Sequence, residues 1–307
     1  MSKHFQLYQH PWLAMLAVML SWIVCLFIFA IISGGLFKQT PGEQSTVFTT
    51  NLLAHITLLF LIVPFVFRLP EGKRSFKAYL DAIRLSHVRP VFQLLLLALS
   101  CYLIQVLCQI GGVLVYRLSH ELPVNWTFIQ MEYHLTKIVP SGSWSWLEPF
   151  PSIFEEVAFR GVVLSVFLLR YSKPKAILFS SIGFGAMHLL NLTGGKELSW
   201  VLGQVAWSVI FGLFYGVLVL KANSLWPAML VHYLGNLFIY PLTAYIQVNA
   251  SVQTQTMYGI IFFFGFIPTT LMILWILLFT KIWPISVRNG LPEIKGTEAA
   301  AAVERIH

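Results

Sequence analysis

The sequence predicts an all-α, polytopic integral membrane protein with about eight transmembrane helices. Of its 307 residues, 57% are hydrophobic and 10% are charged, and the mean hydropathy is +0.76. Soluble domains carry charge on about a quarter of their residues. No polar stretch is long enough to form an independent domain outside the bilayer, so the function is expected in or beside the membrane.

Eight apolar segments are candidates to cross the hydrocarbon core, which takes about 20 helical residues. Charges interrupt the fourth segment and the fifth is short, so hydropathy alone supports these two least. The first apolar run, 26 residues long, exceeds the core of a signal peptide and is expected to remain a helix. The predicted spans are residues 12–37, 47–67, 91–117, 148–170, 175–192, 198–220, 225–246 and 257–283.

The distribution of lysine and arginine orients these spans. With both termini inside, fifteen basic residues lie in inner loops and tails, four lie in outer loops, and Arg160 lies within a span. Inner loops of membrane proteins are enriched in positive charge, so both termini are expected in the cytoplasm. The net charge of +8 then reflects topology and not a nucleic-acid surface, because no long basic tract occurs.

Two connections between spans have a distinct composition. The inner connection, 68–90, is basic and is predicted to form an amphipathic helix along the membrane surface. Its apolar side is formed by residues at helical spacing, which are Phe76, Tyr79, Leu80 and Ile83. The outer connection, 118–147, is rich in aromatic residues and is typical of an interfacial belt, with a cover over a cavity as the alternative. All three cysteines lie within spans, so no disulfide is expected.

The fourth span contains three charged residues, although an ionisable group at the centre of such a helix costs about 2.5–3.5 kcal/mol. These residues are Glu155, Glu156 and Arg160. Glu156 and Arg160 are four residues apart with the glutamate first, which favours an ion pair with a structural role. Glu155 points about 100° away from Glu156, so its partner has to come from another helix.

Later spans supply polar side chains that can meet Glu155. His188 lies in the fifth span, and His232 and Asn236 share one helical face in the seventh. His55, alone in the second span, is interpreted as a core residue. Small residues flank these positions and allow the helices to pack closely. They are Gly161, Gly183, Gly185, Ala186, Gly203, Gly212, Gly216 and Gly235.

A carboxylate and an imidazole that meet at one water molecule are suited to hydrolyse an amide. Glu155 would take a proton from the water, and His188 would hold the water or pass the proton to the leaving amine. His232 and Asn236 would donate hydrogen bonds to the oxygen of the tetrahedral intermediate. Two histidines and a carboxylate can also bind catalytic zinc, but H-E-x-x-H does not occur. No cofactor is therefore expected, and zinc is the alternative.

Three motifs occur in order on three predicted spans: E-E-x-x-x-R from Glu155, F-x-x-x-H from Phe184 and H-x-x-x-N from His232. Over about residues 148–240 the chain resembles the CPBP family of intramembrane proteases. This family includes the eukaryotic CAAX prenyl endopeptidase and the bacterial Abi group.

The resemblance implies a CAAX-protease-like helical bundle and a glutamate-dependent peptidase that needs no metal. In such a peptidase Glu155 and His188 activate water, and His232 and Asn236 form the oxyanion hole. Glu156 and Arg160 have a supporting role.

The expected function is therefore an intramembrane endopeptidase. Its partners would be the lipid bilayer and a membrane-associated or lipidated substrate, including one prenylated at a CAAX-type end, and its location a prokaryotic plasma membrane. A non-catalytic membrane protein that binds peptides, such as a bacteriocin-immunity protein, is the alternative, because it could retain the same cluster. A proton-coupled transporter is disfavoured, because no pair of broken helices is evident.

Three parts are expected along the chain. Residues 1–147 would hold the first three helices with the inner basic and outer aromatic loops, 148–246 the catalytic core, and 247–307 the last helix and a cytoplasmic tail. One conflict remains in this topology. His232 lies seven residues from the inner start of its span, whereas Glu155 lies in the outer half of its own. Either the seventh helix begins deeper in the membrane or a span boundary is wrong.

Overall fold

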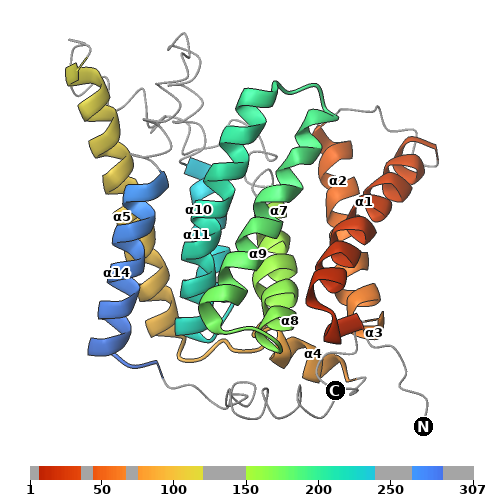
Figure 1. Cartoon of the computed structure of the whole chain (residues 1–307), viewed down its shortest axis with the longest axis horizontal. Helices are drawn as coiled ribbons and strands as arrows, with labels where there is room; N and C mark the ends of the chain where they lie inside the picture. The colour runs from red at the N-terminus through yellow and green to blue at the C-terminus, as the bar shows by residue number, and fades with distance from the viewer. Residues whose placement is uncertain (1–6, 36–43, 67–74, 120–149, 239–264, 286–307) are drawn as a thin grey trace, which may run out of the picture.

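The computed structural model describes residues 7–35, 44–66, 75–119, 150–238 and 265–285, and every regular element in these ranges is helical (Figure 1). The helices are η1 Leu7–Gln9, α1 Pro11–Gly35, α2 Gln44–Ile56, η2 Thr57–Ile62, α3 Val63–Val66, α4 Phe76–Ala82, α5 Val91–Ser119, α7 Pro151–Glu156, η4 Val157–Val163, α8 Leu164–Leu168, α9 Lys173–Met187, η5 His188–Leu192, α10 Leu198–Ala222, α11 Trp226–Phe238 and α14 Ile267–Ile282. The outer aromatic connection and most of the tail lie outside the described residues.

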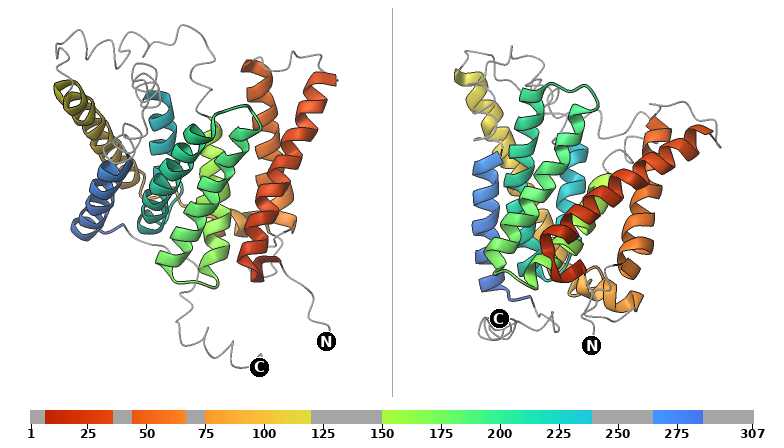
Figure 2. Two further views of the ribbon diagram at one scale, coloured as in Figure 1. Left: turned by 45° about the horizontal axis from the view of Figure 1, so that its top comes forward. Right: turned by 45° about the vertical axis from the view of Figure 1, so that its right-hand side comes forward.

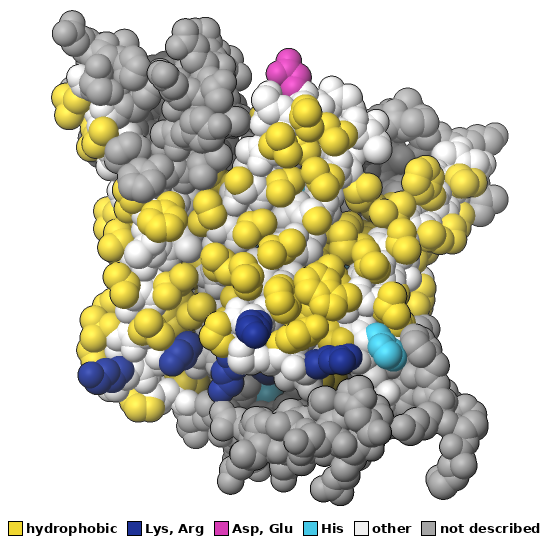
Figure 3. All heavy atoms as spheres, viewed as in Figure 1, with side chains coloured by type: hydrophobic (Ala, Val, Ile, Leu, Met, Phe, Trp, Pro, Cys, Tyr) yellow, Lys and Arg dark blue, Asp and Glu magenta, His cyan; other side chains and the backbone are white. Residues whose placement is uncertain are grey.

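Four described helices are long and apolar enough to cross a membrane. They are α1, the part Val91–Gly112 of α5, the stretch Lys173–Leu192 formed by α9 and η5, and α10. Shorter apolar helices cover Phe48–Ile62 and Ile267–Ile282. In Figure 3 apolar side chains form a broad band across the molecule, and lysine and arginine side chains gather along one end of it. The chain is therefore a helical membrane protein, while the total of eight spans stays a prediction.

The charged fourth segment forms one continuous helix from Pro151 to Leu168, made of α7, η4 and α8. Proline suits the first turn of a helix, where no intrahelical acceptor is available for its missing N–H. The middle part, η4, has wider π-helical turns and begins directly after Glu156. Such turns often accompany functional sites in helices.

The described part of the inner connection, residues 75–90, packs into the protein through Tyr79 and Ile83. Tyr79 and Ile83 are both 0% exposed, and the Tyr79 hydroxyl donates to the Leu59 carbonyl at 2.6 Å. The expectation of a surface-lying apolar side is therefore wrong for these two residues. Phe76, at the start of α4, is 48% exposed. The helix α4 is too short to present two full apolar turns to a membrane. Its apolar side is buried against η2 instead.

Arg84 connects the inner connection to α8 and to the start of α11. Its backbone has φ of 63°, which lies in the left-handed region, and its carbonyl accepts the N–H of Leu225 at 3.3 Å. Its Nη1 donates to Ser165 Oγ at 3.1 Å, and this hydroxyl donates to the Ala82 carbonyl at 3.1 Å. Burial lowers the pKa of Arg84 to about 10, so its guanidinium stays charged at neutral pH.

The small residues bring α9 and α10 into close contact in the centre of the bundle (Figure 2). A Cβ atom added to Gly212 would lie 2.7 Å from Ser181 Cβ, and one added to Gly216 would lie 2.8 Å from Ile177 Cγ2. Any side chain at either glycine would therefore force the two helices apart. This close approach agrees with the role that the sequence predicted for small residues.

The position of the start of α11 explains why the predicted topology placed His232 and Glu155 at different depths. A Cβ atom on Gly161 would lie 3.2 Å from Leu225 Cδ1, so Gly161 and the start of α11 are level. Gly161 precedes the inner end of α8 by seven residues, or about 10 Å of helix. The seventh helix thus begins deeper in the bundle than its predicted boundary. The Arg84 carbonyl contacts this start, because it accepts the N–H of Leu225.

Candidate active site

The first motif forms a buried ion pair that a histidine joins from α11. Glu156 is 0% exposed and Arg160 1% exposed, and Glu156 Oε1 lies 3.2 Å from Arg160 Nη1. The same oxygen lies 2.8 Å from His232 Nδ1, within hydrogen-bond distance. The pair that the helical spacing indicated is present. The bond to His232 was not anticipated, because spacing within one helix carries no information about another.

Glu155 also meets His232, from the other side of the imidazole ring. Its Oε2 lies 3.8 Å from His232 Nε2, so the partner of Glu155 comes from another helix, as the angle between the two glutamates indicated. The Glu155 side chain is 20% exposed, whereas that of Glu156 is 0% exposed. Of the two adjacent carboxylates, Glu155 is therefore the one that water or a substrate can reach.

His188 lies beside this cluster without a direct bond to it. It follows the last residue of α9, and its ring centre is 5.2 Å from that of Phe184. The Phe184 ring in turn lies 6.0 Å from the ring of His232. His188 Nε2 is buried and makes no hydrogen bond among the described residues. The two motif histidines thus flank Phe184, and His188 is close enough to Glu155 for an electrostatic interaction.

Asn236 lies one turn beyond His232 on α11 and is exposed. Within the described part of the chain it joins none of the hydrogen bonds and ion pairs of the cluster. The structure therefore places Asn236 one helical turn beyond His232, with an exposed side chain. Its place in an oxyanion hole stays a prediction.

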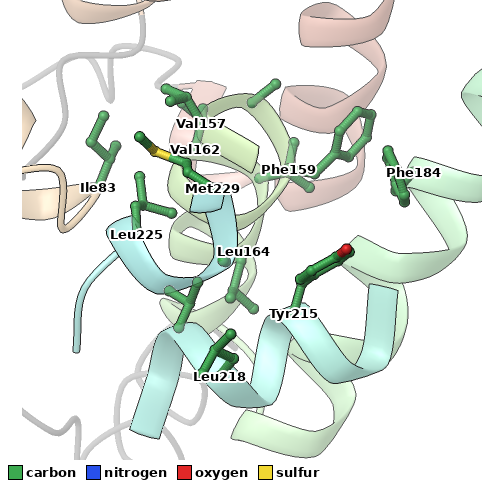
Figure 4. Packing of buried hydrophobic residues seen from close by; sticks show 14 of the residues in the cluster. Ile83, Val157, Phe159, Val162, Leu164, Phe184, Tyr215, Leu218, Leu225 and Met229 are labelled. Atoms are coloured by element: carbon green, nitrogen blue, oxygen red, sulfur yellow. The ribbon is translucent and has the colours of Figure 1, made fainter. Parts of the chain in front are cut away.

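Two aromatic rings hold the buried charges in place. The Arg160 guanidinium lies 4.2 Å from the centre of the Phe184 ring and 5.2 Å from that of Tyr215, which suits cation–π attraction. The Tyr215 ring also stacks on His232, with centres 4.9 Å apart and planes at 22°. Figure 4 shows Phe184 and Tyr215 on one side of the η4 helix, opposite Ile83.

Tyr215 is the site residue that sequence reasoning missed. It is 3% exposed and lies on α10 between Gly212 and Gly216, the glycines that bring α10 against α9. A tyrosine between two close-packing glycines was the available signal. A buried tyrosine is nevertheless common in ordinary cores, so that signal alone could not assign it to a site.

The described residues include no group of three histidine, cysteine, aspartate or glutamate side chains arranged to hold a metal ion. Of the residues that the sequence offered as zinc ligands, His232 bonds Glu156 through Nδ1, and His188 Nε2 makes no hydrogen bond among the described residues. Metal independence stays a prediction that a chelator can test.

Residues 143–238 match the model of a protein family that is described as type II CAAX prenyl endopeptidase Rce1-like. The match contains all three motifs. Neither the curated proteins nor the solved structures gave a match to the chain. The region that carries the cluster is therefore similar to the CPBP/CAAX protease-like family, as the order and spacing of its motifs had indicated.

Proposed function

We propose that the protein is an intramembrane endopeptidase that hydrolyses a peptide bond of a membrane-associated or lipidated substrate, including one prenylated at a CAAX-type end. The observation that carries this proposal is that two adjacent glutamates lie in different environments. Glu156 is fully buried in an ion pair, whereas Glu155 is accessible and lies 3.8 Å from the imidazole of His232. An accessible carboxylate beside two histidines is suited to activate water.

In the proposed mechanism Glu155 removes a proton from a water molecule whose oxygen attacks the scissile carbonyl carbon. The carbonyl oxygen becomes negatively charged, and His232 and Asn236 donate hydrogen bonds to it. The carbon–nitrogen bond then breaks, and the proton passes through Glu155 and His188 to the leaving nitrogen. Glu155 is returned to its ionised form, and no covalent intermediate with the protein is required.

This role places a requirement on the hydrogens of His232. Its Nδ1 bonds to Glu156, so only Nε2 is available to a developing oxyanion. Nε2 also lies 3.8 Å from a Glu155 oxygen, so the His232 ring lies between the two glutamates.

The orientation that we propose places both termini in the cytoplasm of a prokaryotic plasma membrane. Figures 1 and 3 support it, because α1 begins and α14 ends at the end of the bundle where the basic side chains gather. Among the described residues, the inner loops predicted from the sequence contain Lys77, Arg84, Arg89, Arg170, Lys173, Lys175, Lys221 and Lys281. Glycosylation-site tagging of the described loops would test this orientation.

Proteolysis by the detergent-purified protein tests the function. Membrane-associated peptides with and without a C-terminal prenyl group would be incubated with wild type, Glu155→Gln, His188→Ala and a control, Glu197→Gln, whose glutamate is exposed at the start of α10. Loss of a general base costs about 10²–10⁴-fold in rate, so the first two variants should be inactive while the control cleaves normally.

Equal cleavage by wild type and Glu155→Gln would refute the mechanism. Binding of a peptide by wild type without any cleavage would favour the peptide-binding alternative. A strong chelator should leave the rate unchanged, whereas a zinc enzyme would lose activity.

A further inference from the structure

His55 on α2 has a buried nitrogen that the proposed mechanism does not use. The side chain is 0% exposed, and its Nδ1 lies 2.6 Å from the carbonyl oxygen of Asn51. A carbonyl oxygen can only accept, so Nδ1 carries a hydrogen. In the neutral ring Nε2 is then an acceptor, and it has no hydrogen-bond partner among the described residues. A buried polar atom without a partner costs about 1–3 kcal/mol, so this atom needs an explanation.

Trp22 on α1 presents a complementary unpaired atom beside it. Its ring centre lies 4.5 Å from that of His55 with the planes at 66°, and the side chain is 7% exposed. Its indole Nε1 is a buried donor that likewise lacks a partner within the described ranges. One unpaired donor and one unpaired acceptor therefore occur on two rings in contact. Together they match the two kinds of hydrogen bond that a water molecule forms.

Both rings lie next to the segment that carries Glu155. The His55 ring stacks on Phe154, the residue before Glu155, with centres 5.2 Å apart and planes at 27°. His55 is also close enough to Glu155 for an electrostatic interaction. Buried waters make about three hydrogen bonds to groups that are otherwise unsatisfied. Trp22, His55 and Glu155 offer one donor and two acceptors, which is a complete set for one water.

We propose that Trp22, His55 and Glu155 hold one water molecule, and that this water is the one consumed in peptide hydrolysis. The indole N–H donates to the water oxygen, while the water donates its two hydrogens to His55 Nε2 and to the Glu155 carboxylate. The fate of the water rests on the proposed function, but its binding does not. A hydrolase inside a bilayer needs such a site, because the surrounding lipid supplies no water to the reaction.

In the reaction the water oxygen bonds to the scissile carbonyl carbon, and the O–H bond that faced Glu155 breaks. Its hydrogen passes to Glu155 and later to the leaving nitrogen, and the carbon–nitrogen bond breaks. The other O–H bond becomes that of the new carboxyl group. His55 keeps its own hydrogen throughout and acts as a positioning residue, because it orients the water before attack.

Hydroxyl-radical labelling of the whole detergent-purified protein tests the binding of the water directly, because radicals formed from a bound water mark the residues around it. In wild type we expect Trp22 and Phe154 to be labelled although they are 7% and 8% exposed, whereas Phe214, at 0%, stays unlabelled. In His55→Phe the labelling of Trp22 should fall at least fivefold.

Kinetics with a cleaved peptide test what the water does. Loss of one hydrogen bond to the water should lower kcat by roughly fivefold to tenfold in His55→Phe and in Trp22→Phe, with KM unchanged. His55→Gln retains an acceptor oxygen and should recover part of the rate. The matched control is His87→Phe. His87 Nδ1 also bonds a backbone carbonyl, that of Asn223 at 2.8 Å, but this residue lies in the inner connection.

Thermal unfolding of each variant shows whether it is folded, and Trp22→Phe and His55→Gln carry the test if His55→Phe is not. Unlabelled Trp22 in wild type, or equal labelling in wild type and His55→Phe, would overturn the water site. Lost labelling with an unchanged kcat would show a structural water and overturn its part in hydrolysis. If wild type cleaves no peptide, the proposed function fails, while the labelling still decides whether the water is bound.

Discussion

Neutralising Glu156 should destabilise the protein, whereas neutralising its neighbour Glu155 should not. Glu156 is 0% exposed and contacts two cationic or protonatable partners, Arg160 at 3.2 Å and His232 at 2.8 Å. Removing one charge from a buried pair costs about 3–5 kcal/mol, because the other charge is left uncompensated. The aromatic faces of Phe184 and Tyr215 retain part of the attraction for Arg160, worth about 1–2 kcal/mol.

The difference gives an expected loss of about 1–4 kcal/mol for Glu156→Gln. The pair is held by charge more than by directed hydrogen bonds, since neither Nη1 nor Nη2 of Arg160 makes one among the described residues. The uncharged amide is therefore a poor substitute. Glu155→Gln should stay within about 0.5 kcal/mol of wild type, because the side chain is 20% exposed and its contact with His232 is long.

Thermal and denaturant unfolding in one detergent would measure both variants, with cleavage assayed on the same samples. A double-mutant cycle adds the variant Arg160→Met, which removes the opposite charge of the pair. If the pair is coupled as described, the double variant should lose less stability than the two single variants together. Equal stability of Glu156→Gln and wild type, or a larger loss in Glu155→Gln, would refute this assignment of structural and catalytic carboxylates.

Three further predictions follow from the packing around the site. Gly212→Ala would place a Cβ 2.7 Å from Ser181 Cβ and should cost about 1–3 kcal/mol with reduced activity, while the control Gly111→Ala, with nothing within 4 Å, should be neutral or gain about 0.5–1 kcal/mol in thermal unfolding. Tyr215→Phe keeps the stacking on His232 and should cleave at a rate within about threefold of wild type, whereas Tyr215→Leu should lower kcat by roughly tenfold. Ser165→Ala leaves the buried Arg84 guanidinium without its hydroxyl partner and should lower stability by about 1–3 kcal/mol in the same unfolding assay.

Features encoded along single helices were predictable from the sequence. The Glu156–Arg160 pair follows from four-residue spacing, and the need of Glu155 for a partner on another helix follows from the angle between neighbouring residues. The close approach of α9 and α10 follows from the glycines that line it. Each of these inferences uses only the period of a helix and the size of a side chain.

Features that depend on how helices lie against one another were not predictable in this way. The bond from Glu156 to His232 and the stacking of Tyr215 need the relative depth of three helices, and hydropathy gives each boundary only to within a turn or more. The same limit produced the conflict over the depth of α11. The amphipathic pattern of the inner connection was recognised, but an apolar helix side fits a membrane surface and a protein surface equally well.

The burial of Glu156 also accounts for the position of Glu155. A charge within the membrane is tolerated when it is paired, and Glu156 pairs with Arg160 one turn later on its own helix and with His232 on α11. The contact with His232 fixes the rotation of the helix about its axis, and the preceding side chain is then turned by about 100°. That rotation directs Glu155 to the accessible side of His232, where its carboxylate is 20% exposed. The fully buried glutamate thus acts as the positioning element for the accessible one, and a first motif with two adjacent glutamates needs both for different physical reasons.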